Sequence, residues 1–211
     1  MMLPMQLFSK RNILIVIGLI VLGLIGREIY IRSTASITPS PSTNATSSAP
    51  TLITPNYNES IAFSDNISSD TRLQLTTQLT QIQEKIRNNP LDLQAWESLG
   101  AVYKMGGDYA HAKEAWEYIM SVSPSSPAPY SDLGDMYMNF LKDYPQAEKN
   151  YLKVVELRPK AIAAYHNLYT LYRYLYKTNT SAASDILKEG LKNNPGNAEL
   201  LSLQQELEAG N

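Results

Sequence analysis

The sequence predicts an all-α protein in which pairs of helices repeat along the second half of the chain. Three observations support this fold class. Prolines recur at intervals of 34, 35 and 36 residues, at Pro90, Pro124, Pro159 and Pro195. Aromatic, leucine and alanine residues stand at fixed distances from these prolines. The segments between them carry apolar residues three or four positions apart, which is the spacing of one face of a helix.

The composition is that of a protein with a folded core. The 211-residue chain is 44% hydrophobic and 18% charged, with a formal net charge of -2. From Asp70 onward, 14 Lys and Arg stand against 17 Asp and Glu without a basic stripe, which argues against nucleic acid as a partner. Cysteine is absent, so the chain forms no disulfide and offers no thiolate ligand. We expect no metal and no other cofactor.

The N-terminal part predicts a membrane anchor. An apolar run of 14 residues, 13–26, follows Lys10 and Arg11. Continued to residue 31, it gives about 28 Å of helix at 1.5 Å per residue, close to the thickness of a bilayer core. We expect residues 1–12 in the cytoplasm and residues 13–31 as an uncleaved, single-pass transmembrane segment. A cleaved signal peptide is the second interpretation. Both interpretations export the C-terminal domain.

A spacer and a helical domain follow the anchor. Residues 33–69 are rich in Ser, Thr, Pro and Asn, a composition that cannot bury enough apolar surface to fold, and we expect a disordered linker. The helical domain then covers residues 70–211.

We expect the helical domain to begin and end with single helices. A leading helix over residues 70–89 carries an apolar stripe and ends at Pro90. A capping helix over 197–209 has leucines on one face and Glu and Gln on the other, as suits the end of a stack. Three pairs of helices lie between them, at about 91–124, 125–159 and 160–195.

The repeated positions have a specific register. Six residues after each of the first three prolines is a large aromatic residue, three positions later a leucine, and four positions after that a tyrosine. These residues are Trp96, Leu99 and Tyr103; Tyr130, Leu133 and Tyr137; and Tyr165, Leu168 and Tyr172. The alanine twelve positions before each closing proline also recurs, as Ala112, Ala147 and Ala183.

This register resembles the tetratricopeptide repeat, whose 34-residue signature is W-x2-L-G-x2-Y, then A-x3-F, then P. The first repeat, with "WESLGAVY" and "AHAKEAW", matches nearly every signature position. The second, with "YSDLGDMY" and "AEKNY", is close, and the third, with "YHNLYTLY" and "ASDIL", departs most. The resemblance covers about residues 91–195. It implies antiparallel helices A and B in each repeat, stacked into an α-solenoid.

Glycine in helix A indicates a close approach of two helices. Gly100 costs about 1 kcal/mol relative to alanine, and we expect it to face Ala112 on helix B. The third repeat carries Tyr169 at this position and Gly190 on helix B, which we interpret as an exchange of bulk between the two helices. Gly106 and Gly107 mark the A–B turn.

The repeats also differ in length. Because turns tolerate insertions better than helices, we expect the additional residues of repeats two and three between their helices, near residues 142–144 and 177–180. The run "YHNLYTLYRYLY" contains two tyrosines, Tyr174 and Tyr176, that the signature does not require. They either pack against the capping helix or contact a ligand.

The resemblance also implies a concave groove, lined by the A helices, that binds an extended peptide or a partner helix. The positions one, five, eight and nine after the core aromatic line that groove. From them we take these partner-binding candidates: Glu97, Lys104, Met105, Asp135, Met138, Asn139, His166, Arg173 and Tyr174. The remaining groove positions are Ala101, Ser131 and Thr170. Family members that clamp an acidic peptide terminus carry a set of Lys, Asn and Arg in this groove. This chain has Glu97, Ala101 and Asp135 at key positions, so we do not expect such a clamp.

Motifs of enzymes are absent. The chain has no G-x-S-x-G, P-loop, H-E-x-x-H or G-x-G-x-x-G, so we expect no catalytic residue. The expected function is a membrane-tethered, extracytoplasmic scaffold or adaptor that binds a protein partner. The order of anchor, spacer, single helix and repeats is similar to the periplasmic domains of bacterial membrane-assembly factors, including those of cytochrome c maturation. The alternative is a self-associating structural protein of the cell envelope.

Overall fold

The computed structural model describes residues 54–178 and 180–210. These residues form helices joined by turns, preceded by one extended segment, and they contain no β-strand. The all-α class is therefore confirmed for this part of the chain. The predicted anchor at 13–31 and residues 33–53 of the predicted linker lie outside the described residues. No helix within the described ranges has the length and hydropathy needed to cross a bilayer.

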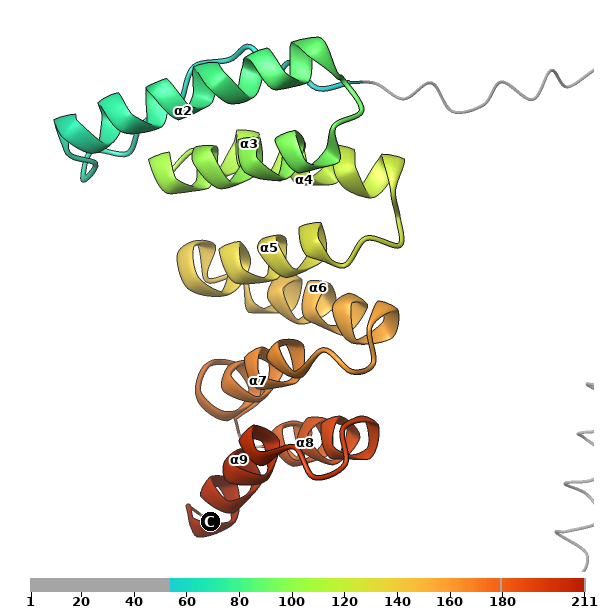
Figure 1. Cartoon of the computed structure of the whole chain (residues 1–211). Helices are drawn as coiled ribbons and strands as arrows, with labels where there is room; N and C mark the ends of the chain where they lie inside the picture. The colour runs from blue at the N-terminus through green and yellow to red at the C-terminus, as the bar shows by residue number, and fades with distance from the viewer. Residues whose placement is uncertain (1–53, 179, 211) are drawn as a thin grey trace, which may run out of the picture. The chain divides into compact units, whose positions relative to one another are not determined.

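The described residues form eight helices, two of which end in a π turn. In order they are α2 (Ser69–Asn88), α3 (Leu93–Gly106), α4 (Tyr109–Val122), α5 (Ala128–Met136) with its continuation η1 (Tyr137–Leu141), α6 (Tyr144–Leu157), α7 (Ile162–Thr170) with its continuation η2 (Leu171–Leu175), α8 (Ala182–Asn193) and α9 (Ala198–Ala209). The order is that expected, with one leading helix, three pairs and a last helix. They follow one another as a stack from α2 to α9 (Figure 1).

Each pair of helices is an antiparallel hairpin. In the first pair, the start of α3 meets the end of α4, where the rings of Trp96 and Tyr118 have centroids 4.4 Å apart. The end of α3 meets the start of α4, where the rings of Tyr103 and His111 are 5.1 Å apart. The turn between them has Gly107 at φ 85° and Asp108, whose carboxylate accepts the His111 N–H and so caps α4.

One turn geometry occurs four times, once before each recurring proline. The residues at these turns have φ from -143° to -132° and ψ from 68° to 90°, and they are Asn89, Ser123, Arg158 and Asn194. Each N–H donates to the carbonyl four residues earlier, and each carbonyl accepts from the N–H three residues later. A following proline disfavours the helical conformation, so all four helices end at the same place relative to it. The backbone therefore repeats with the period of the prolines.

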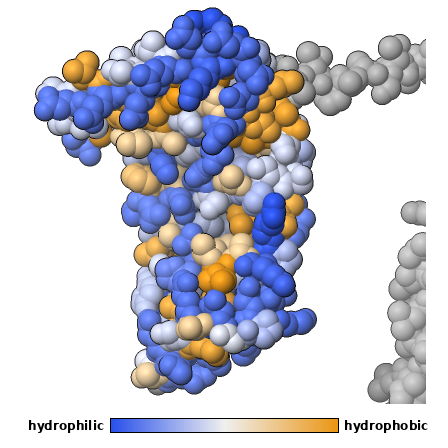
Figure 2. Space-filling view, viewed as in Figure 1, coloured by the Kyte–Doolittle hydropathy of each residue, from blue (hydrophilic) through white to orange (hydrophobic). Residues whose placement is uncertain are grey.

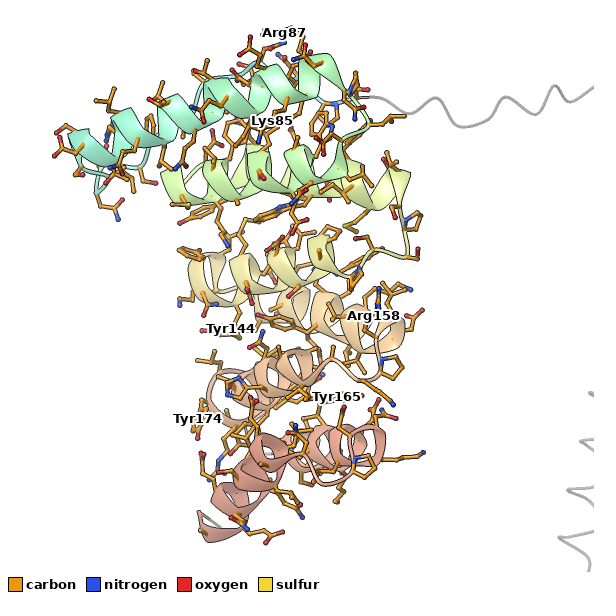
Figure 3. The ribbon with its side chains drawn as sticks, viewed as in Figure 1. Lys85, Arg87, Tyr144, Arg158, Tyr165 and Tyr174 are labelled. Carbon is orange, nitrogen blue, oxygen red and sulfur yellow. The ribbon has the colours of Figure 1, made fainter. Side chains whose placement is uncertain are left out.

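The core aromatic residues fasten these turns. Trp96 Nε1 donates to the carbonyl oxygen of Pro90 at 2.9 Å, and the hydroxyl of Tyr165 donates to that of Pro159 at 2.9 Å. Tyr130 makes the equivalent bond to Pro124 at 3.3 Å. Figure 3 shows Tyr165 between α7 and α8. An aromatic residue six positions after the proline thus satisfies a carbonyl that the helices leave unpaired.

The glycines of the A helices make room for an aromatic ring of the B helix. A Cβ at Gly100 would lie 2.4 Å from Nε1 of Trp116, and one at Gly134 would lie 2.6 Å from the ring of Tyr151. Both rings are fully buried. The nearest neighbour of Gly100 is therefore Trp116, and not Ala112 as the sequence suggested. Burial of a large apolar side chain, worth about 1.5–3 kcal/mol, offsets the poor helix propensity of glycine.

The third repeat solves the same packing problem differently. A Cβ at Gly190 would lie 3.0 Å from Cγ of Tyr165 and 3.1 Å from Cδ1 of Leu200. Tyr169 is buried and donates its hydroxyl to Glu206 of α9 at 3.3 Å. The space at Gly190 is therefore filled by Tyr165 and by α9, and not by Tyr169 as expected.

The additional residue of repeats two and three lies inside helix A. The left-handed residue of the A–B turn stands four positions after the recurring tyrosine in repeat one and five positions after it in repeats two and three. The left-handed residues are Gly107, Lys142 and Lys177, with φ of 85°, 55° and 60°. A π turn accommodates one inserted residue, and η1 and η2 occupy these positions. The expectation of an insertion between the helices is therefore wrong for repeat two and holds only for the second additional residue of repeat three.

Residues 54–67 form an extended segment, here called the strap, that packs against the first helices. Ile61 is buried, and its side chain contacts the backbone at Gly106. The hydroxyl of Tyr103 donates to the Glu59 carbonyl at 2.8 Å, and the Ala62 N–H donates to Asp108 at 2.9 Å. The expectation of a disordered linker through residue 69 is therefore wrong for residues 54–69.

Buried apolar side chains form two clusters that follow one another along the stack. The first joins the strap, α2, α3, α4 and α5. The second joins η1, α6, α7 with η2, α8 and α9. Seen as in Figure 1, the surface is mostly hydrophilic, with small apolar patches scattered along the stack (Figure 2).

Candidate protein-binding face

The predicted groove residues lie on helices α3, α5 with η1, and α7 with η2, whose shared surface is here called the A-helix face. The charges of Glu97, Lys104 and Asp135 all act on one further carboxylate, that of Asp132. All four side chains are half-buried. Asp132 on α5 thus lies within electrostatic range of two further carboxylates and one ammonium group.

The carboxyl group of Asp132 has an altered affinity for protons. Burial raises the pKa of Asp132 to about 6, against a reference value of 3.8. The charge of Lys104 lowers this pKa, whereas Glu97 and Asp135 raise it. Because burial disfavours the charged form, Asp132 changes its charge two pH units nearer to neutrality than an exposed aspartate does. A positively charged group that a partner brings close to Asp132 would lower the pKa of this carboxyl group, because it favours the charged form.

Asp135 connects the second hairpin to the third. Its Oδ1 accepts from the hydroxyl of Tyr151 on α6 at 2.6 Å and from Nδ2 of Asn167 on α7 at 3.3 Å. A carboxylate with two donors is held in one orientation. The polar surface that begins at Glu97 on α3 therefore continues through Asp135 to Asn167 on α7.

Lys104 and Met105 lie toward the strap end of this face. The Lys104 ammonium is 5.6 Å from the centre of the Trp116 ring, within the range of a cation–π contact. Met105 is 55% exposed. Both border a cleft of about 360 Å³ that is also lined by Ile67, Tyr109 and Phe140, among others. Lys104 and Met105 are therefore accessible from this cleft.

Met138 is not a surface residue. Only 6% of it is exposed, and it belongs to the second core cluster. Asn139, the next residue, is exposed. The inserted residue of η1 rotates the positions that follow it about the helix axis, so a count based on a regular α-helix assigns Met138 to the wrong side. Met138 is removed from the candidate set and Asn139 stays in it.

Arg173 and Tyr174 contact α9. Nη2 of Arg173 donates to the Gly210 carbonyl at 3.4 Å, and the hydroxyl of Tyr174 donates to Glu206. Tyr174 lies at the η2 end of α7, next to α9 (Figure 3). Of the two interpretations of this tyrosine, packing against the last helix is the one that the structure shows. His166 and Thr170, earlier on the same helix, are half-buried.

Two residues of the face were missed by the sequence argument, Asp132 and Asn167. Both stand two positions after the core aromatic, where the first repeat has Ser98. A small polar residue at this position in all three repeats was the available signal. The family pattern of groove positions, one, five, eight and nine after the core aromatic, does not include this position.

The A-helix face presents carboxylate and amide groups. Its carboxylates and amides suit charge-assisted hydrogen bonds to a cationic side chain. Within residues 54–178 and 180–210, no three His, Cys, Asp or Glu side chains are grouped so that they could hold a metal ion.

Comparisons with known proteins add no relative. No protein-family model matches the sequence, and no curated protein matches it significantly. The likeness to tetratricopeptide repeats therefore rests on the repeated residues and turns described above.

Proposed function

We propose that this chain is a scaffold of the tetratricopeptide-repeat type that holds a segment of another protein on its A-helix face. The four equivalent turns, the aromatic residues that fasten them and the glycines that admit a ring between the helices all support a solenoid of stacked hairpins. A solenoid presents one continuous surface formed by equivalent helices of successive repeats.

The observation that carries the proposal is the polar continuity of that surface across three helices. Asn167 on α7 donates to Asp135 on α5, and the charges of Asp135 and of Glu97 on α3 both act on Asp132. All four side chains are half-buried. Lys104 supplies the one positive charge among these five side chains. Such a surface favours a partner segment with Lys or Arg side chains, because opposite charges steer association and fix its register.

The proposal includes a membrane tether, which rests on the sequence. The apolar run within residues 13–31 supports a membrane anchor, and Lys10 and Arg11 before it support export of the helical domain. The strap then holds the first hairpin at the end of the chain that leads to the anchor.

Single cysteines test the proposal, because the native chain contains none. A photoreactive cross-linker is attached at Ser131→Cys on the A-helix face of the full-length protein, in its native membrane. Leu152→Cys on α6, at a side chain that is 41% exposed, is the matched control. We expect a partner adduct from Ser131→Cys that is lost when Glu97→Lys is added, and none from Leu152→Cys.

Two outcomes would contradict the proposal. Equal adducts from both cysteines would show that the A-helix face has no preference for the partner. Cross-links only between copies of the chain would instead support the self-associating envelope protein.

A further inference from the structure

The strap shows how this fold binds an extended segment. It lies in a groove, here called the first groove, bordered by α2 and α4 and floored by α3. The Glu59 carbonyl accepts from Tyr103 of α3 at 2.8 Å and from Gln83 of α2 at 3.1 Å. The ring of Tyr57 meets that of Trp96 edge to face, with centroids 5.9 Å apart. Pro55 lies against the outer side of α4.

An equivalent groove exists one repeat further along. A cleft of about 380 Å³, here called the second groove, lies between α4 and α6 over α5 and η1; it is lined by Glu117, Met120, Tyr130, Leu133, Tyr137, Gln146, Lys149, Asn150 and Lys153. In the register of the four turns, Tyr130 and Tyr137 correspond to Trp96 and Tyr103. Lys149 corresponds to Glu114. The second groove therefore repeats the walls and floor that hold the strap.

The three tyrosines of this register use their hydroxyls differently. Tyr103 donates to the strap, and Tyr172 donates to Glu148 of α6 at 2.6 Å. Glu148 also forms an ion pair with Lys177 at 2.6 Å. The hydroxyl of Tyr172 in the third repeat is therefore already bound by a residue of the same chain. The half-buried Tyr137 lines the second groove, and within the described residues its hydroxyl has no hydrogen-bond partner. The middle repeat thus offers the donor that the first repeat uses to hold a main-chain carbonyl.

A second polar group faces the same groove. Asn150 is 92% buried, since its exposed fraction is 8%, and its Nδ2 donates to the Gln146 carbonyl at 2.8 Å. Its Oδ1 is left as an acceptor. In the first groove this position is Ala115. A donor from Tyr137 and an acceptor from Asn150 suit the C=O and N–H groups of an extended peptide.

The charge of the second groove differs from that of the first. Burial and the charges of Asp108, Glu59 and Glu114 all raise the pKa of the Tyr103 hydroxyl, so the strap is held beside several carboxylates. Lys149 replaces Glu114 in the second groove. An acidic residue at the place of Glu59 would meet a cation there instead of another carboxylate.

We propose that the second groove binds an extended segment of a partner protein that carries an aromatic residue and, two positions later, an acidic residue. Its main chain would pair with Tyr137 and Asn150, its ring would pack on Tyr130 and its carboxylate would meet Lys149. The strap of each chain is held in its own first groove, so the segment comes from a different protein.

This inference goes beyond the proposed function. Tyr130, Leu133 and Tyr137 lie on the side of α5 opposite Asp132 and Asp135, because successive residues of a helix are about 100° apart. The two surfaces can therefore bind independently.

A labelled peptide tests the inference. The probe has the strap sequence of residues 54–67, which contains Tyr57 and Glu59 in the required spacing, and is added to the full-length protein in detergent while its fluorescence polarisation is measured. We expect saturable binding. Tyr137→Phe should weaken it about 2- to 12-fold, the loss that follows from one hydrogen bond. Lys149→Glu should weaken it too, and a probe with Glu59→Lys should restore binding to that variant.

Matched controls separate this site from the others. Tyr109→Phe and Lys192→Glu make the same chemical changes outside the second groove, and we expect unchanged binding of the probe. Thermal unfolding of each variant checks that it is folded.

Four results would overturn the inference. The first is the absence of saturable binding to the wild-type protein. The second is a loss with Tyr103→Phe and none with Tyr137→Phe, which would assign the probe to the first groove. The third is a loss with Glu97→Ala alone, which would refute this inference and leave the proposed function intact. The fourth is self-association that Tyr137→Phe abolishes, which would assign the groove to a second copy.

Discussion

Replacing Gly100 with alanine sets helix propensity against packing. Alanine gains about 1 kcal/mol in the interior of a helix. Its Cβ, however, would lie 2.4–2.8 Å from three ring atoms of Trp116, which is fully buried and has no free space to enter. Overpacking costs about 1–3 kcal/mol, and displacement of the Trp116 N–H from the Glu97 carbonyl, 3.4 Å away, costs about 1 kcal/mol more. We expect a net loss of about 2 kcal/mol in the free energy of unfolding.

Urea unfolding of the protein, followed by tryptophan fluorescence, measures this loss. The same substitution in a Trp116→Leu background has room for the methyl group, and there we expect Gly100→Ala to be neutral or to stabilise by up to about 1 kcal/mol. Ala101→Gly, the reverse exchange at the next residue, should cost about 1 kcal/mol. A Gly100→Ala variant as stable as the wild type, or an equal effect in both backgrounds, would refute the packing argument.

Three further predictions concern the site, the third repeat and the strap. Asp132→Asn should stabilise the protein by about 1 kcal/mol at pH 7, allowing for screening by solvent. The gain should vanish below about pH 4. Because the pKa of Asp132 is raised to about 6, the folded wild type binds more protons than the unfolded chain between pH 4 and 6, and its stability falls as the pH rises through that window. Equal differences in melting temperature between variant and wild type at pH 4 and pH 7 would contradict this. Gly190→Leu should lose about 1–3 kcal/mol through overpacking against Tyr165, and an unchanged melting temperature would rule that contact out. Ile61→Asp should release the strap from Gly106, seen as faster hydrogen exchange at residues 59–64; unaltered protection would show that the strap is held without this contact.

The helices and their ends could be predicted because local signals agree with the tertiary structure. The apolar stripe of α2 is buried as expected, through Leu75, Leu79, Ile82 and Ile86. Each proline ends a helix by its own local sterics, so the turns needed no knowledge of distant residues. The same holds for Glu97 and Asp135, which a count of positions from the core aromatic assigns to the A-helix face.

The strap could not be predicted because its partners are distant in the sequence. Glu59 and Tyr103 are 44 residues apart, and Ala62 and Asp108 are 46 apart. Its few apolar residues stand among Asn, Ser and Asp, so the composition of residues 33–69 as a whole is that of a polar linker.

The prediction that Met138 lies on the A-helix face was wrong for another reason. One additional residue fits a turn or a π-helical segment equally well in the sequence, and only packing against α6 decides between them. The same uncertainty applies to any surface assigned by counting past such an insertion.

The four matching turns also make this chain a molecule that can be shortened or lengthened. Asn89 and Ser123 leave their helices along the same path, so excising residues 90–123 would join α2 directly to α5 without a new connection. Duplicating that stretch would add one hairpin, and with it one more copy of the cleft between neighbouring B helices. The length of the helical stack is thus set by the number of such units that the chain contains.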